Sequence, residues 1–65
     1  MQSLLEGREI IFEYRQVGKL TRVMALDVIT MTEAVISCPK GPQDQMQNLA
    51  LKRLEYVMKK KGILI

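Results

Sequence analysis

Polar and apolar residues alternate along the first half of the chain. Between Arg8 and Val17, Ile10, Phe12 and Tyr14 alternate with mostly charged neighbours, a period of two that predicts a half-buried strand with these three side chains facing the core. Gly18-Lys19 predicts a tight turn after it, because glycine readily adopts the positive φ that hairpin turns need. Further upstream, Ser3 to Glu6 has capping-box spacing and predicts at most one helical turn before Gly7.

A second strand is predicted from Leu20 to Val28, and both of its faces are partly apolar. Met24 and Leu26 lie on one face, whereas Val23 and Ala25 lie on the other. Such a pattern is typical of a central strand or of a sheet that is covered on both sides.

The hairpin connection that follows is predicted to be organised by Asp27, whose carboxylate can accept hydrogen bonds from amides two or three residues further on. Glu33 to Cys38 is predicted as the third strand, and Pro39 ends it because proline donates no ladder hydrogen bond.

The spacing of apolar residues changes to a helical period between Gln43 and Lys61. Pro42 suits the first turn of this helix and Gly62 its end. The centre of the predicted apolar stripe is formed by Met46, Ala50, Leu54 and Val57, with Leu49, Leu51 and Met58 beside it. The sequence therefore predicts an α+β fold of βββα order, in which residues 1–65 form a single domain. A three-stranded antiparallel meander is followed by one C-terminal helix packed on one face of the sheet.

The composition limits the chemistry that this chain can carry. It has 65 residues, no histidine and one cysteine, so the commonest general base, an intramolecular disulfide and a zinc site of Cys and His ligands are all excluded. Cys38 is expected to be a small core residue, and Glu9 and Glu13 stand about 13 Å apart on an extended strand, too far for cooperation as acid and base. We therefore expect no catalytic residue, no metal, no cofactor and no small-molecule substrate, and we interpret the chain as a non-enzyme.

The location is expected to be cytoplasmic. The N-terminal residues lack a basic leader with a long apolar run, and no stretch approaches the roughly 18 apolar residues that a membrane span needs. A chain this short buries only about 60% of its unfolded surface, so association with another chain is a natural source of added stability.

Three segments carry a resemblance to a known family: residues 8–14, residues 25–33 and residues 49–54. Together they resemble a family of very short bacterial proteins of unknown function, along roughly residues 8 to 60. The resemblance implies glycine more often at position 31, where this chain has Met31 in the connection between the second and third strands. Some similar chains carry a serine hydroxymethyltransferase label, yet a domain of this size is not expected to enclose that enzyme's cofactor site. No functional residues follow from the resemblance.

Surplus apolar surface is the first feature that could carry a function. If the helix covers one face of the sheet, apolar residues remain on the other face, and the C-terminal tail is also unassigned. Either the tail folds back beside the helix in a monomer, or these groups mark a contact surface for a homodimer or another protein. The residues of this predicted association surface are Ile11, Val23, Ala25, Val35, Ile63, Leu64 and Ile65.

A basic flank on the helix is the second feature. Residues 34–65 carry six basic and two acidic groups, and the helical period places several cations around one tyrosine. This arrangement suits phosphate contacts with base stacking, although lysines late in a helix also balance its dipole and keep the surface soluble. The predicted nucleic-acid contacts are Lys52, Arg53, Tyr56, Lys59 and Lys60. A protein-interaction or self-association module is the preferred hypothesis, with weak nucleic-acid binding as the alternative.

Overall fold

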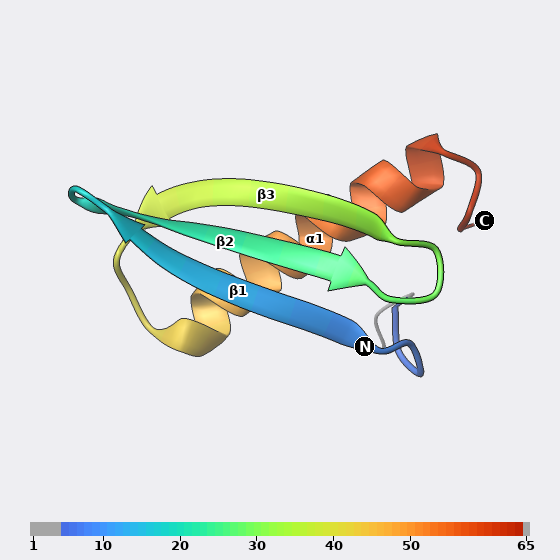
Figure 1. The fold of residues 1–65 in the computed structure, drawn as a ribbon, viewed down its shortest axis with the longest axis horizontal. Coiled ribbons are helices and arrows are strands. Elements are labelled where there is room, and N and C mark those ends of the chain that lie inside the picture. The colour runs from blue at the N-terminus through green and yellow to red at the C-terminus, as the bar shows by residue number, and fades with distance from the viewer. Residues whose placement is uncertain (1–4, 65) are drawn as a thin grey trace.

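A computed structural model describes residues 5–64, which form a three-stranded sheet followed by one helix (Figure 1). The strands are β1 (Ile10–Val17), β2 (Leu20–Asp27) and β3 (Thr32–Pro39), and the helix is α1 (Gln43–Lys60). Both strand pairs are antiparallel, in the order β1-β2-β3. The predicted βββα arrangement is confirmed.

The ends of the elements differ from the prediction by a few residues. β1 begins at Ile10 rather than Arg8, and β3 includes both Thr32 and Pro39. Upstream of β1, residues 5–7 form a turn, whereas Ser3 lies outside the described residues.

The β1–β2 hairpin follows directly from its two-residue turn. Gly18 has a φ of 61°, so it adopts the left-handed conformation that glycine tolerates best. The turn pairs Val17 with Leu20, and the same register pairs Tyr14 with Val23 further along the hairpin.

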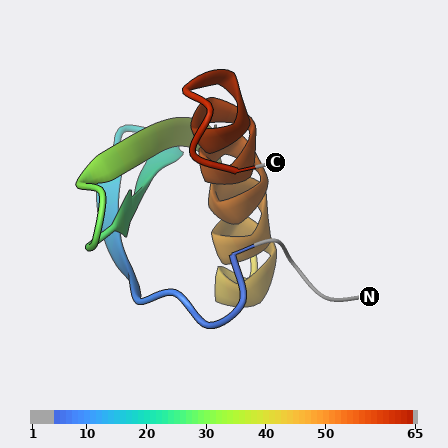
Figure 2. The same cartoon turned by 90° about the vertical axis from the view of Figure 1, so that its right-hand side faces the viewer.

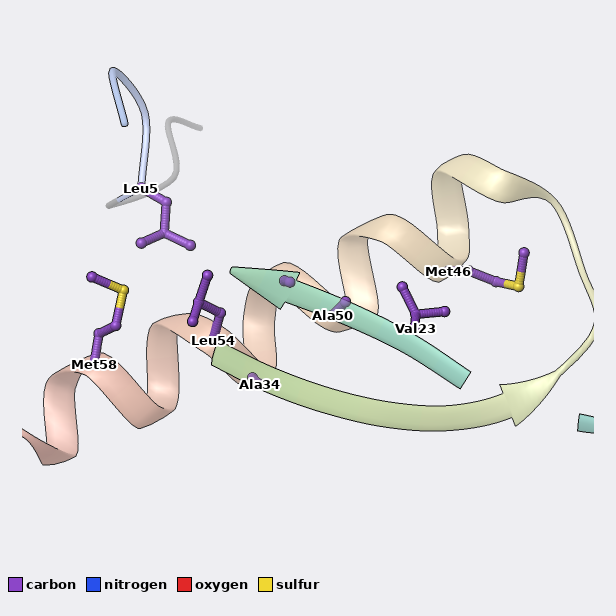
Figure 3. Close-up of a cluster of buried hydrophobic side chains, with 8 residues drawn as sticks. Leu5, Val23, Ala34, Met46, Ala50, Leu54 and Met58 are labelled. Carbon is purple, nitrogen blue, oxygen red and sulfur yellow. The ribbon is translucent and has the colours of Figure 1, made fainter. Parts of the chain in front are cut away.

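The helix lies across one face of the sheet and packs on β2 and β3 more than on β1 (Figure 2). We call this the covered face, and the opposite side of the sheet the open face. Small side chains at the contact, such as Ala25, Ala34 and Ala50, allow the helix to approach the strands closely. The buried apolar residues of the core are Leu5, Val23, Ala25, Ala34, Met46, Ala50, Leu54 and Met58 (Figure 3).

The apolar stripe of α1 is rotated slightly from its predicted centre. Met58 is buried completely and Val57 only partly, while Leu49 points outward with 49% of its surface exposed. Gly62 ends the helix as predicted, with a φ of 76°, and the amide of Ile63 donates a 2.9 Å hydrogen bond to the carbonyl of Met58.

Candidate interaction surfaces

The open face consists of four rows, because each residue of β2 that points away from α1 stands between one residue of β1 and one of β3. Starting from the β1–β2 turn, the rows are Val17–Leu20–Pro39, Arg15–Arg22–Ser37, Glu13–Met24–Val35 and Ile11–Leu26–Glu33. We number them first to fourth. Ile11 and Val35 are 46% and 42% exposed, so these two predicted surface residues do lie on the open face.

Val23 and Ala25 were expected on the same surface, and that prediction is wrong. Both are fully buried under α1. The register pairs Ala25 with Phe12 and Val23 with Tyr14, and partners in an antiparallel pair share a face of the sheet. Met24 and Leu26 occupy the open face in their place.

The predicted contribution of the C-terminal tail to the association surface also changes. Ile63 and Leu64 are half-buried and pack against the core, so the chain folds back after Gly62. Of the two outcomes considered for this tail, the fold-back arrangement is the one observed for these two residues. Ile65 lies outside the described residues.

The charges of the open face are unevenly distributed. Arg15 and Arg22 are direct cross-strand partners in the second row, where like charges repel. Within residues 5–64 neither guanidinium has a carboxylate at ion-pair distance. Glu13 stands in the third row and Glu33 in the fourth. A hollow of about 180 Å³ is lined by the two arginines of the second row and by the three residues of the third row.

The basic flank lies on the outer side of α1. The buried residues of α1 recur every four positions from Met46 to Met58, and at 100° per residue the basic group is centred on the opposite side of the helix. Its residues Lys52, Arg53, Tyr56, Lys59 and Lys60 are all exposed.

Several of these side chains already have partners. The guanidinium of Arg53 lies 5.1 Å from the centre of the Tyr56 ring, and the ammonium of Lys60 lies 5.4 Å from it. Cations at these distances are attracted to the ring. Lys59 forms an ion pair with Glu55 one helical turn earlier, at 3.6 Å. The ring is therefore engaged within α1, which competes with base stacking.

Asp27 lies at the open end of the β1–β2 hairpin, and the sequence predicted its hydrogen bonds but not its burial. Asp27 is fully buried, and its Oδ2 accepts hydrogen bonds from the amide and the hydroxyl of Thr30, at 3.1 and 2.6 Å. This is the predicted role of Asp27 in the connection. Arg8 adds a 3.2 Å ion pair, which the sequence pattern alone did not indicate.

These contacts decide the ionisation of Asp27. The hydrogen bond from the Thr30 hydroxyl, together with the nearby charge of Arg8, holds the pKa of the Asp27 carboxyl below its ordinary value, although burial acts in the opposite direction. Its second oxygen, Oδ1, is buried and has no hydrogen-bond partner in the part of the chain that the structure describes. The carboxylate fixes the connection between β2 and β3, and Met31 in this connection has a φ of 56°.

The structure places the other reactive groups apart. Cys38 is half-buried on the covered face beside the core, as expected of a core residue, while Glu9 and Glu13 are exposed. Residues 5–64 contain no cluster of three or more metal-ligating side chains. No helix within the same range is long and apolar enough to cross a membrane.

Comparison with protein families identifies one match. The family model described as "Domain of unknown function (DUF6898)" matches residues 7–61, which include all three strands and the helix. No curated protein and no solved structure matches the chain. Because the matched segment is most of the sequence, the chain belongs to this family of domains of unknown function.

Proposed function

We propose that this chain is a small non-enzymatic protein-interaction module that associates with a second copy of itself through the open face. One observation supports this most directly: large apolar side chains recur in three of the four rows of that face. They are Val17, Leu20, Met24, Val35, Ile11 and Leu26. Large apolar side chains gathered on one open face of a small domain often mark an interface.

The core of this domain is small, so association with a second copy would add to the stability of the folded state. Among residues 5–64, eight apolar residues are buried between the helix, the sheet and the N-terminal turn, and three of these are alanines. A second copy seated on the open face would give the sheet an apolar layer on both sides. Binding that is specific to the folded state also stabilises that state by mass action.

The test is sedimentation of the wild-type chain over micromolar to millimolar concentrations, with two variants that each add one positive charge. Met24→Lys introduces a lysine at the centre of the open face, and we expect it to be monomeric. Asn48→Lys introduces the same residue on the exposed outer side of α1, and we expect it to dimerise like the wild type. A wild-type chain that remains monomeric throughout, or a Met24→Lys variant that still dimerises, would contradict the proposal.

Nucleic-acid binding is a second candidate, supported by the grouping of cations on the outer side of α1. If Lys52, Arg53, Lys59 and Lys60 contact phosphates of a duplex, the logarithm of the affinity should fall with that of salt with a slope of about −3 to −4. Each substitution to glutamine should then lower the slope by about one and weaken all sequences alike. Retention that vanishes at physiological salt would reject this candidate. That result is the one we expect, because the Tyr56 ring and Lys59 already have partners.

A further inference from the structure

The pattern of charges on the open face points to one particular arrangement of the two copies. We infer that they pack open face to open face about a two-fold axis that is perpendicular to the strands and passes between the second and third rows. Arg15 of each copy then meets Glu13 of the other. This inference rests on the proposed function and specifies its geometry.

The arrangement follows from the symmetry of the face. When two identical sheets pack face to face, the two-fold axis lies between them and parallel to both. If the strands of the two sheets stay aligned, the axis runs either along the strands or across them. An axis across the strands keeps β1 over β1 and reverses the order of the rows. The first row then lies on the fourth, and the second row lies on the third.

This superposition matches residues of complementary character along β1, while Arg22 lies over Met24 and Glu33 lies over Pro39. Arg15 lies over Glu13 of the second copy, and the contact occurs twice because the axis repeats it. In the outer rows Leu20 lies over Leu26, and Val17 lies over Ile11. Sheets that pack in this way keep their strands within about 30° of each other and about 10 Å apart, so opposing side chains interdigitate.

An axis along the strands gives a poor match. It leaves each row over itself and exchanges β1 with β3. Arg22 of one copy would then face Arg22 of the other, Glu13 would face Val35, and Ile11 would face Glu33. This arrangement brings like charges together and leaves both Glu13 and Glu33 against apolar groups, whereas the axis across the strands pairs Glu13 with Arg15.

The same arrangement resolves the repulsion within the second row. In the single chain Arg15 stands opposite Arg22 without an acidic partner among the described residues. In the dimer Glu13 of the second copy brings a carboxylate beside Arg15. The hollow of about 180 Å³ lies between the second and third rows, where the axis passes, and it offers space for Met24 of the second copy.

The size of the face sets the expected affinity. Three strands about 4.8 Å apart and eight residues of about 3.3 Å each give a face of about 14 by 26 Å. As a flat rectangle this is about 360 Å² per copy, less than the roughly 800 Å² per partner of a stable interface, so we expect a weak dimer with a dissociation constant in the micromolar range or above. In a weak interface the charge pairs decide which arrangement forms.

Two single charge reversals test this geometry. Glu13→Arg places two arginines of one copy against two of the other, and Arg15→Glu does the same with glutamates. We expect each variant alone to raise the dissociation constant at least about tenfold. Mixed in equal amounts, the two variants should form a heterodimer of wild-type affinity, since every arginine at position 13 or 15 then meets a glutamate. The double variant Glu13→Arg/Arg15→Glu should recover the homodimer.

Circular dichroism and thermal melting of each variant provide the control for folding, since both side chains are exposed. Two outcomes overturn the geometry: single variants that dimerise like the wild type, or a mixture that stays monomeric. The proposed function survives either outcome if Met24→Lys still dissociates the wild-type dimer. Both proposals fail together only if the wild-type chain does not dimerise, or if it does so independently of Met24, as in pairing through the edge of β1.

Discussion

The two faces of the sheet are both rich in apolar residues, yet they differ in side-chain size. Along β2, the covered face has Val23 and Ala25, whereas the open face has Met24 and Leu26. The larger and more hydrophobic pair is therefore the one that the helix leaves uncovered. Close approach of a helix to a sheet depends on small side chains at the contact, so hydrophobicity alone does not determine which face of the sheet the helix covers.

The two faces also differ in the exposure and the partners of their polar side chains. Charges on the open face are exposed, and the repulsion between Arg15 and Arg22 has no internal remedy within residues 5–64. On the covered face, by contrast, polar side chains occupy the ends of the strands and have partners: Asp27 contacts Thr30 and Arg8, and the hydroxyl of Thr21 donates to the side chain of Gln16 at 3.2 Å. The charge of the covered face is therefore paired, although the Tyr14 hydroxyl and Oδ1 of Asp27 are buried without a partner within residues 5–64, whereas the arginines of the open face have no acidic partner there.

The largest expected effect comes from placing the same residue on the two faces of β2. Val23→Lys should unfold the domain, because burying an unpaired charge where Val23 now lies exceeds the roughly 5 kcal/mol by which so small a domain is stable. Met24→Lys, one residue further along, should cost under about 1 kcal/mol in the monomer. Thermal melting of both variants by circular dichroism measures the difference. Equal melting temperatures would contradict the difference in burial between the two faces, and a lower value for Met24→Lys would mean that the faces are exchanged.

Asp27→Asn is the next largest change, because it removes the one acidic charge of the covered face. The amide can still accept from Thr30 but loses the ion pair with Arg8, so we expect a loss of about 1–3 kcal/mol at pH 7. Urea denaturation at fixed pH gives this value.

The pH dependence of the same variant tests the ionisation of Asp27. Since its pKa in the folded protein is lowered, the carboxylate stabilises the fold fully above its unfolded pKa of about 3.9, and this contribution is lost as the pH falls through the lower folded value. The gap in stability between wild type and Asp27→Asn should therefore shrink below about pH 4. A gap that stays constant down to pH 2 would mean that the carboxylate titrates normally.

A smaller and opposite effect is expected in the connection between β2 and β3. Met31 has a φ of 56° and is 69% exposed, so its side chain strains the backbone without adding much packing. Met31→Gly should stabilise the domain by about 1 kcal/mol, because glycine removes the Cβ clash of the left-handed conformation. Ile29→Gly in the same loop is a matched control, since Ile29 is exposed and its φ is not positive, and it should not stabilise.

The sequence predicts the order of elements well because each strand and the helix has a local signal, either alternation or the helical period. The face of β2 was mispredicted because both of its faces are partly apolar, so alternation within this strand alone does not identify the face that meets the helix. A signal for the correct answer was available: the two-residue turn at Gly18-Lys19 fixes the register, which pairs Phe12 with Ala25. Combining turn length with the alternation of β1 would have placed both strands correctly.

The contacts described above are of two kinds: some join residues that are close in sequence, and others join residues that are distant in sequence. The partners of the Tyr56 ring are three and four residues away on one helix, a spacing that sequence alone could reveal. The ion pair between Arg8 and Asp27 joins two residues that are 19 positions apart in sequence but adjacent at the open end of the hairpin, and the burial of Leu5 depends on how the N-terminal turn meets the helix. Neither has a local signature, so both required the folded chain.

The smallest expected effect concerns the side chain of Tyr14, which lies on the covered face of β1. The hydroxyl of Tyr14 is buried and has no hydrogen-bond partner among residues 5–64, so the folded state loses the water that solvates this group when the chain is unfolded. Tyr14→Phe keeps the ring that packs beside the core and removes only this oxygen, and we expect it to be neutral or to stabilise the domain by up to about 1 kcal/mol. Tyr56→Phe is the matched control: its ring is half exposed, so loss of its hydroxyl should leave stability unchanged. Paired urea titrations measure both variants, and a destabilised Tyr14→Phe with an unchanged Tyr56→Phe would mean that the Tyr14 hydroxyl has a partner in solution.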